Sequence, residues 1–218
     1  MSVTTNKPSI STLESTYSKA AKPSLYYAIN KGIVREWYDE KDGWTADDIR
    51  WKGNRMLLRY AAQGDLDSVQ WAVETFGLTV KDVRSNGGMI LGFTCENGHL
   101  ATAQWLAEKF GLTIEDVRVK NSYALRAACE QGHYDIVVWL SETFELTAED
   151  TKSEYDDALS RTCMCDHLDI FGYLVERYKF TAGDIRAAVG SMPDDPDERE
   201  QEIIQVVNAF ARSRELCG

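Results

Sequence analysis

The sequence predicts an all-α solenoid, a stack of helix pairs, and three observations support this prediction. First, the same residue types return every 34 residues along most of the 218-residue chain. Second, each period holds a short segment rich in Ala and Leu and then a longer amphipathic segment, both with helical spacing. Third, each period closes on a Thr followed three residues later by an Asp, a pair typical of a helix start. Fixed-period repetition is the signature of stacked repeat proteins.

The period defines the division of the chain. Its columns are Trp71, Trp105, Trp139 and Tyr173; Gly64, Gly98 and Gly132; and the Thr–Asp pairs that begin at Thr45, Thr79, Thr113, Thr147 and Thr181. We expect a flexible, Ser/Thr-rich arm at 1–24 and a single solenoid at 25–218. Its units are 25–50, 51–84, 85–118, 119–152 and 153–186, followed by a C-terminal cap at 187–218. An irregular, acidic last unit suits a cap, because a terminal repeat must present a polar face to water.

Two helices are expected in each unit. The first is short, as in 123–130 (YALRAACE), and a Gly follows it, which best tolerates the positive φ of a helix end. The second, as in 99–110 (HLATAQWLAEKF), places its apolar residues on one helical face.

A capped turn is expected to end each unit. In the third unit Thr113 caps a helix whose third residue is Asp116, while Leu112 and Val117 stand at the two ends of a hydrophobic staple. In the fourth unit Thr151 replaces the aliphatic end of the staple, which weakens it.

Composition excludes several classes of function. The chain carries 24 basic and 35 acidic residues, a net charge of −11, which argues against binding a nucleic-acid backbone. No run approaches the roughly 18 apolar residues of a membrane span. The five cysteines, an odd number without a dense framework, favour a reducing compartment. We therefore expect an acidic cytoplasmic protein, monomeric when alone, with no nucleic-acid or membrane partner.

The unit core resembles a known family. ALRAACEQGHYDIVVWL (Ala124–Leu140) is similar to the two-helix core of an ankyrin repeat, whose pattern reads TPLHxAAxxGHxxIVxxLL. The Gly-His pairs at Gly98 and Gly132 match it, and the resemblance covers about residues 25–186. The family's β-hairpin segment is replaced by Gly-Leu-Thr-x-x-Asp-Val-Arg (Gly77–Arg84, Gly111–Arg118). We expect short capped helical turns in place of most hairpins.

The resemblance implies a function. Ankyrin-like arrays hold partner proteins on a concave surface, so we expect a non-catalytic protein–protein interaction scaffold without a cofactor. The units are also similar to those of protist and giant-virus ankyrin arrays, which suggests an effector that captures a host protein. For a secreted effector whose signal peptide was removed, the alternative location is the host cytoplasm or nucleus.

The family pattern also implies where a partner binds. Residues flanking the Ala pair of the first helix face the concave groove, and these columns change chemistry from unit to unit. The candidate protein-binding residues are Arg55, Arg59, Gln63, Met89, Phe93, Asn97, Tyr123 and Gln131. Met89, Phe93 and Tyr123 are expected to form an apolar patch, and the polar residues of this set are expected to form a rim around it. Such an arrangement is typical of protein interfaces. The alternative is that Phe93 turns inward and fills the space left by Gly92.

A Cys-dependent enzyme or a metal-binding repeat protein is the alternative function. Cys95/His99, Cys129/His133 and Cys163/His167 repeat a Cys and a His four residues apart. Stacked units lie about 10 Å apart, however, whereas ligands of one zinc ion lie about 4 Å apart because the bonds are 2.0–2.3 Å. The pairs also occur three times, whereas a catalytic set should occur once. We expect these histidines to be hydrogen-bonded parts of the scaffold, and neither catalytic residues nor metal ligands.

Overall fold

The computed structural model describes residues 45–151, 158–189, 201 and 205–209. All of them belong to one compact unit. The expected arm at 1–24, residues 25–44 of the first unit, the start of the fifth unit and most of the cap lie outside the described residues.

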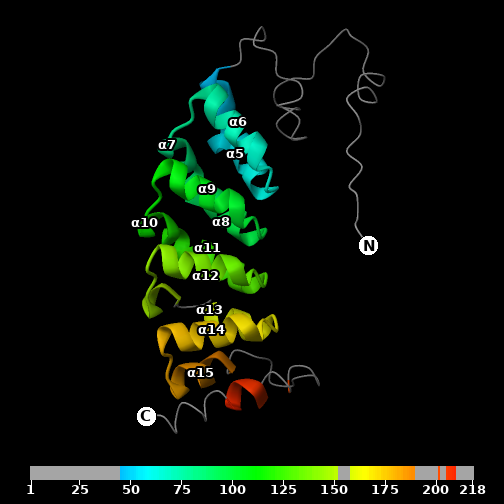
Figure 1. Cartoon of the computed structure of the whole chain (residues 1–218), viewed down its shortest axis with the longest axis vertical. Helices are drawn as coiled ribbons and strands as arrows, with labels where there is room; N and C mark the ends of the chain where they lie inside the picture. The colour runs from blue at the N-terminus through cyan, green and yellow to red at the C-terminus, as the bar shows by residue number, and fades with distance from the viewer. Residues whose placement is uncertain (1–44, 152–157, 190–200, 202–204, 210–218) are drawn as a thin grey trace, which may run out of the picture. The chain divides into compact units, whose positions relative to one another are not determined.

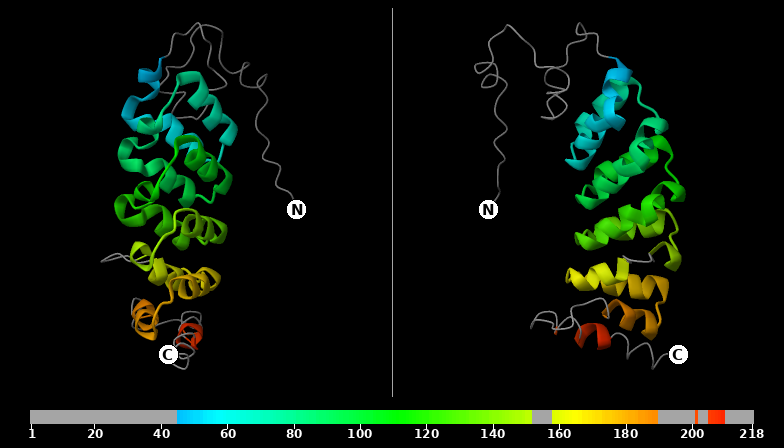
Figure 2. Two further views of the ribbon diagram at one scale, coloured as in Figure 1. Left: turned by 60° about the vertical axis from the view of Figure 1, so that its left-hand side comes forward. Right: turned by 180° about the vertical axis from the view of Figure 1, so that it is seen from behind.

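The described chain forms two layers of helices. The first-helix layer contains α5 (Trp51–Ala62), α8 (Met89–Glu96), α11 (Val119–Glu130) and α13 (Ala158–Met164), each packed on the next. The second-helix layer contains α6 (Leu66–Phe76), α9 (Leu100–Phe110), α12 (Tyr134–Thr143) and α14 (Leu168–Tyr178). Each second helix packs on the first helix that precedes it, so the pairs stack one above another (Figure 1) and two columns of helices are visible in Figure 2. α15 (Ala182–Val189) packs against α13.

Short helical turns connect one unit to the next. They are α4 (Ala46–Ile49), α7 (Val80–Val83), α10 (Ile114–Val117) and the 3₁₀ turn η3 (Ala148–Thr151). A second 3₁₀ segment, η2 (Ser85–Gly88), leads into α8. No β-strand occurs in the described part of the chain, which confirms the prediction that capped helical turns replace hairpins.

The fourth unit departs from the others because its turn is 3₁₀. Thr151, which replaces the aliphatic end of the staple, is buried, and its hydroxyl donates to the carbonyl of Ala148 at 2.6 Å. The backbone N–H of Asp150 donates to the carbonyl of Thr147, three residues earlier, which is the backbone spacing of a 3₁₀ turn. The weaker staple predicted at this position therefore coincides with a tighter turn.

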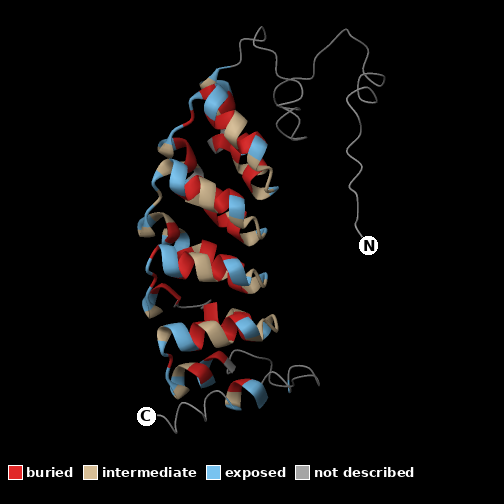
Figure 3. Ribbon diagram, viewed as in Figure 1, coloured by how far each residue is buried: buried red, intermediate tan, exposed pale blue. Residues whose placement is uncertain are grey.

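One continuous core runs between the two layers. Leu57, Leu91, Leu125 and Leu159, the matching leucines of the first helices, are at most 4% exposed. Small residues such as Ala124, Ala128 and Cys129 lie beside them and allow the first helices to approach closely. Buried and exposed stretches alternate along each helix (Figure 3), as amphipathic helices require.

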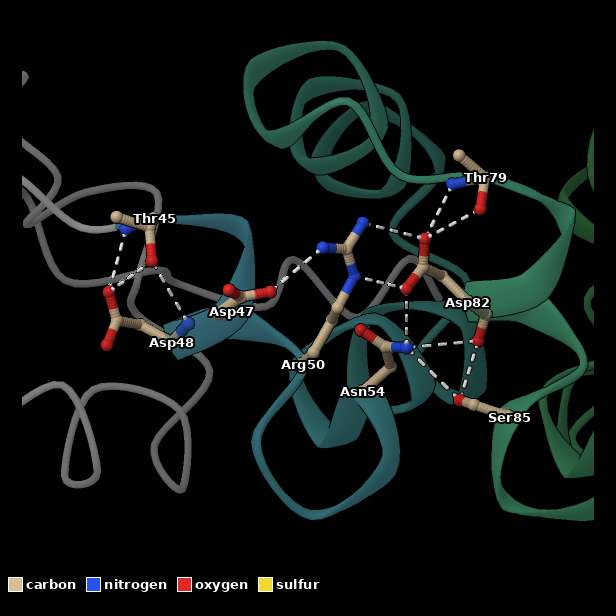
Figure 4. Close-up of polar contacts among 8 residues, drawn as sticks. All are labelled: Thr45, Asp47, Asp48, Arg50, Asn54, Thr79, Asp82 and Ser85. Atoms are coloured by element: carbon tan, nitrogen blue, oxygen red, sulfur yellow. Dashed lines mark hydrogen bonds and ion pairs between the residues drawn. The ribbon is translucent and has the colours of Figure 1, made fainter.

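Each Thr–Asp pair closes on itself, and the three aspartates Asp82, Asp116 and Asp150 also bind an arginine of the preceding unit. Asp82 accepts hydrogen bonds from the backbone N–H of Thr79 at 2.7 Å and from its hydroxyl at 3.0 Å. The same carboxylate accepts two bonds from Arg50, from Nε at 2.6 Å and from Nη2 at 3.2 Å (Figure 4). Arg84 binds Asp116 in this way, and Arg118 binds Asp150. A ladder of bidentate ion pairs thus joins successive units, which we call the Arg–Asp ladder.

The ladder carboxylates are largely buried and ionised. Burial opposes ionisation of Asp82, but hydrogen bonds from Arg50, Thr79 and Asn54 outweigh it and lower its pKa to about 2. At Asp116 and Asp150 the arginine is the largest cause, and it lowers the pKa of both carboxyls against the effect of burial. A pair with two parallel bonds at a half-buried site contributes more than an exposed one.

Three of the first helices, α5, α8 and α11, contain or follow residues with left-handed backbone near their start. Positive φ occurs at Asn54 in α5, at Gly87 and Gly88 in η2, and at Lys120, Asn121 and Ser122 in α11. The left-handed conformation costs an L-residue roughly 1–2 kcal/mol, a cost that glycine avoids. The third unit therefore enters its helix with less strain than the fourth.

We expect Asp82→Asn to lower the free energy of unfolding at pH 7 by about 2 kcal/mol. The pKa of Asp82 falls from 3.8 to about 2 on folding, so its contribution is present above the higher value and is lost as the pH falls through the lower one. Urea unfolding of both proteins at a series of pH values measures this, and the two curves should converge near pH 2. Asp47, which bonds Arg50 but is exposed, is the control: Asp47→Asn should cost less than about 1 kcal/mol. Parallel pH curves for the wild-type and Asp82→Asn proteins would contradict the expectation.

Lys120→Gly should raise the free energy of unfolding by about 1 kcal/mol, because it removes left-handed strain at φ 51. The bond from Arg126 to Lys120 goes to the backbone carbonyl of Lys120, so that contact survives the change. Lys81 in α7 is the matched control. It has the same side chain in right-handed helix, so Lys81→Gly should cost about 1 kcal/mol. If both variants changed the free energy of unfolding by the same amount and in the same direction in chemical denaturation, the left-handed backbone at Lys120 would not be the cause of the effect.

Candidate protein-binding site

The candidate residues lie along the first-helix layer. Arg55 and Arg59 are on α5, Met89 and Phe93 on α8, and Tyr123 on α11. Gln63, Asn97 and Gln131 occupy the residue just after each of these helices. Arg55 and the three amide side chains are exposed, whereas Arg59, Met89, Phe93 and Tyr123 are half-buried.

The structure brings Phe93 and Tyr123 together. Their rings meet edge to face, with centroids 6.0 Å apart and planes at 78°. We call these two residues the aromatic pair. Edge-to-face contacts of this kind contribute about 0.5–1.5 kcal/mol beyond area burial. Two neighbouring units therefore supply one apolar feature on this face.

Tyr123 is held in place from two sides. Its ring lies against Gly92, where a Cβ atom would come within 2.7 Å of Tyr123 Cδ1. Its hydroxyl donates to Glu96 at 2.7 Å. Burial first, and then the bond to the Glu96 carboxylate, raises the pKa of Tyr123 to about 12, so the phenol stays protonated at neutral pH. Tyr123 from the next unit thus occupies space beside Gly92.

The rim is less regular than the sequence suggests. Asn97 turns back and donates its side-chain amide to the carbonyl of Phe93 at 2.8 Å. At the next level Glu130 pairs with Arg161, which occupies the position equivalent to Phe93, at 3.2 Å. Met164 at the end of α13 is 52% exposed. Sequence analysis did not select Met164, although it stands in the column of Glu96 and Glu130.

The histidine column belongs to the joints between units. His99 Nε2 donates to the carbonyl of Ala62 at 3.1 Å, and His133 and His167 bond the carbonyls of Glu96 and Glu130 at 3.0 Å. Each ring also packs against the Gly of the preceding unit, where a Cβ atom would come within 2.4–2.6 Å. These bonds confirm the interpretation of the histidines as hydrogen-bonded parts of the scaffold.

The cysteines of the same column are enclosed. Cys95, Cys129 and Cys163 have no exposed surface. Burial raises the pKa of the Cys95 and Cys129 thiols, which keeps them protonated and weakly nucleophilic. Among the described residues, no group of three or more His, Cys, Asp or Glu side chains is placed to hold a metal ion.

The second-helix layer carries a groove of about 450 Å³ that sequence analysis missed. It lies between the ends of α9 and α12, and its apolar lining includes Leu112, Ile114 and Phe144. Glu108 and Glu145 add acidic groups to it. No periodic signal marks the groove, because Glu145 stands where the preceding units have Gly77 and Gly111.

Comparison with known proteins relates part of the array to a known family. Its class is an all-α repeat solenoid without a strand in the described part. A family model described as ankyrin repeats, in three copies, matches residues 57–150, which extend from α5 to η3. Over this segment, a little under half of the chain, the protein is similar to ankyrin repeats, as the resemblance implied. No curated protein matches the chain.

The family carries a general function. Ankyrin repeats mediate protein–protein interaction and are typically not enzymes, so the chain is expected to have protein partners. In the part of the chain that the structure describes, no helix is long and apolar enough to cross a bilayer.

We expect a metal chelator to leave the melting temperature of the chain unchanged. The histidines bond backbone carbonyls, and the cysteines are buried in the core. His133→Ala should cost about 1–3 kcal/mol, since the carbonyl of Glu96 loses its donor, and the cost should be the same with and without chelator. Thermal melts of both proteins with and without EDTA measure this. A drop in the melting temperature of the wild-type protein on adding chelator would overturn the assignment, because structural zinc contributes directly to folding.

Proposed function

We propose that the chain is a non-catalytic scaffold that binds a partner protein on the first-helix layer, at the aromatic pair. The observation that carries this proposal is the half-buried contact between Phe93 and Tyr123. Aromatic residues in a polar surround provide much of the binding energy of many interfaces. The exposed side chain of Asn97 lies beside the pair, because its amide bonds the carbonyl of Phe93.

The aromatic pair is already ordered before a partner arrives. Glu96 and Gly92 fix Tyr123, and Tyr123 in turn packs on Phe93. Binding therefore needs little further loss of side-chain freedom, which improves affinity for a given contact area.

The finer parts of the function follow from the resemblance. The first-helix layer corresponds to the concave face of ankyrin arrays, and the similarity to protist and giant-virus arrays supports an effector that captures a host protein in the cytoplasm. The chain acts as a monomer in this proposal.

Phe93→Ala combined with Arg59→Glu should reduce partner capture at least tenfold while helicity and melting temperature change little, because both side chains are only half-buried. Affinity purification from cells, quantified by mass spectrometry against the wild-type chain, measures this. Tyr134→Ala is the matched control, since Tyr134 is an aromatic residue 39% exposed on the second-helix layer. If the double variant retains all the partners while Tyr134→Ala loses them, the binding face is the second-helix layer.

A further inference from the structure

Most arginines of the first-helix layer and its connectors already have acceptors. Arg50, Arg84 and Arg118 bind the carboxylates of the Arg–Asp ladder. Arg161 binds Glu130. Arg126 donates to backbone carbonyls of Lys120 and Asn121. The positive charges on these elements are therefore used within the fold.

Arg55 and Arg59 are different. They lie one turn apart on α5 and so share one helix face. In the described part of the chain neither guanidinium has an ion pair, and Arg59 Nε is shielded from water without any hydrogen-bond acceptor. A buried donor without an acceptor costs about 1–3 kcal/mol.

The acidic groups near the aromatic pair are already bonded. Glu96 accepts the bond from Tyr123, and Glu130 pairs with Arg161. The α5 end of the layer thus has two cationic side chains and no carboxylate bonded to them, in a chain whose net charge is −11. Charge complementarity at this end favours an acidic segment of a partner.

The two arginines lie next to the aromatic pair along the stack. Arg59 and Phe93 hold equivalent positions on α5 and α8, which pack against each other. α8 in turn packs on α11, which carries Tyr123. A bound segment that follows the layer therefore meets guanidinium groups first and aromatic rings one helix further.

We infer that this face takes an acidic peptide segment of the partner protein, in which two carboxylates bind Arg55 and Arg59 and a neighbouring apolar side chain packs on Phe93 and Tyr123. The guanidinium group matches the planar carboxylate with two parallel hydrogen bonds. Two acidic residues one helical turn apart match the spacing of the two arginines. The inference rests on the proposed function and adds the chemistry of the partner.

A random peptide library, selected on the full chain, tests the inference. The enriched peptides should carry paired acidic residues beside an aromatic or aliphatic residue. Arg55→Glu combined with Arg59→Glu should weaken binding of a selected peptide at least about tenfold in fluorescence anisotropy. Changing the acidic residues of that peptide to Lys should restore its binding to the charge-reversed variant. Circular dichroism establishes that the variant is folded.

The control reverses two charges elsewhere. Lys109→Glu combined with Arg177→Glu makes the same change in net charge at exposed positions of the second-helix layer, and it should leave peptide binding unchanged. Equal weakening by both pairs of reversals would mean that only net charge matters, and it would overturn the inference.

The remaining outcomes separate the inference from the proposed function. Peptides without acidic residues, no enriched peptide at all, or binding that survives reversal of Arg55 and Arg59 but falls in Phe93→Ala would overturn the acidic-segment inference alone. Peptide binding that neither the reversal nor Phe93→Ala changes would overturn the proposed function as well.

Discussion

The bidentate bond between an arginine of one unit and the capping aspartate of the next is the contact on which the stack depends. In a repeat protein each unit contacts only its neighbours, so its stability rests on the joints between them. Asp82 serves two units at once, because it closes the turn at Thr79 and accepts Arg50 from the unit before. A half-buried carboxylate is costly without such partners, and an arginine without it would be an uncompensated charge. The turn and the joint are therefore one structure.

A second joint lies at the other end of each first helix. There the His of one unit donates to a carbonyl of the preceding unit and packs against its Gly, which needs both the missing Cβ and the positive φ. The first helices are thus fixed at both ends. Equivalent residues on α5, α8 and α11 consequently face one surface in register, which is why Phe93 can meet Tyr123 from the next unit.

The local parts of this structure were predictable from the sequence, and the contacts between units were less so. Thr113 with Asp116 marks its own helical turn because both partners lie within one turn. Arg118 and Asp150 are 32 residues apart, and although arginines recur with the period, spacing alone does not say which carboxylate each one binds. The left-handed entry at Lys120 was also missed, because neither Lys nor Ser signals positive φ as Gly87 does. At the candidate site, the sequence columns lie on the first-helix layer, but spacing alone did not indicate that the ring of Tyr123 packs against Gly92 of the preceding unit.

The chemistry of the joints explains how the binding face can vary while the fold stays constant. The histidines bond the backbone carbonyls of Ala62, Glu96 and Glu130, so the joint is indifferent to the side chains at those positions. The same column continues as the exposed Met164. Similarly, Arg59 and Phe93 occupy one position of the repeat, and neither takes part in the Arg–Asp ladder or the histidine bonds. Side chains on this face can therefore change charge and size from unit to unit without weakening the stack. An interaction surface requires that freedom. The His and Cys columns are instead constant from unit to unit, and the cysteines are buried, whereas a nucleophile with its base should occur once and be accessible to substrate.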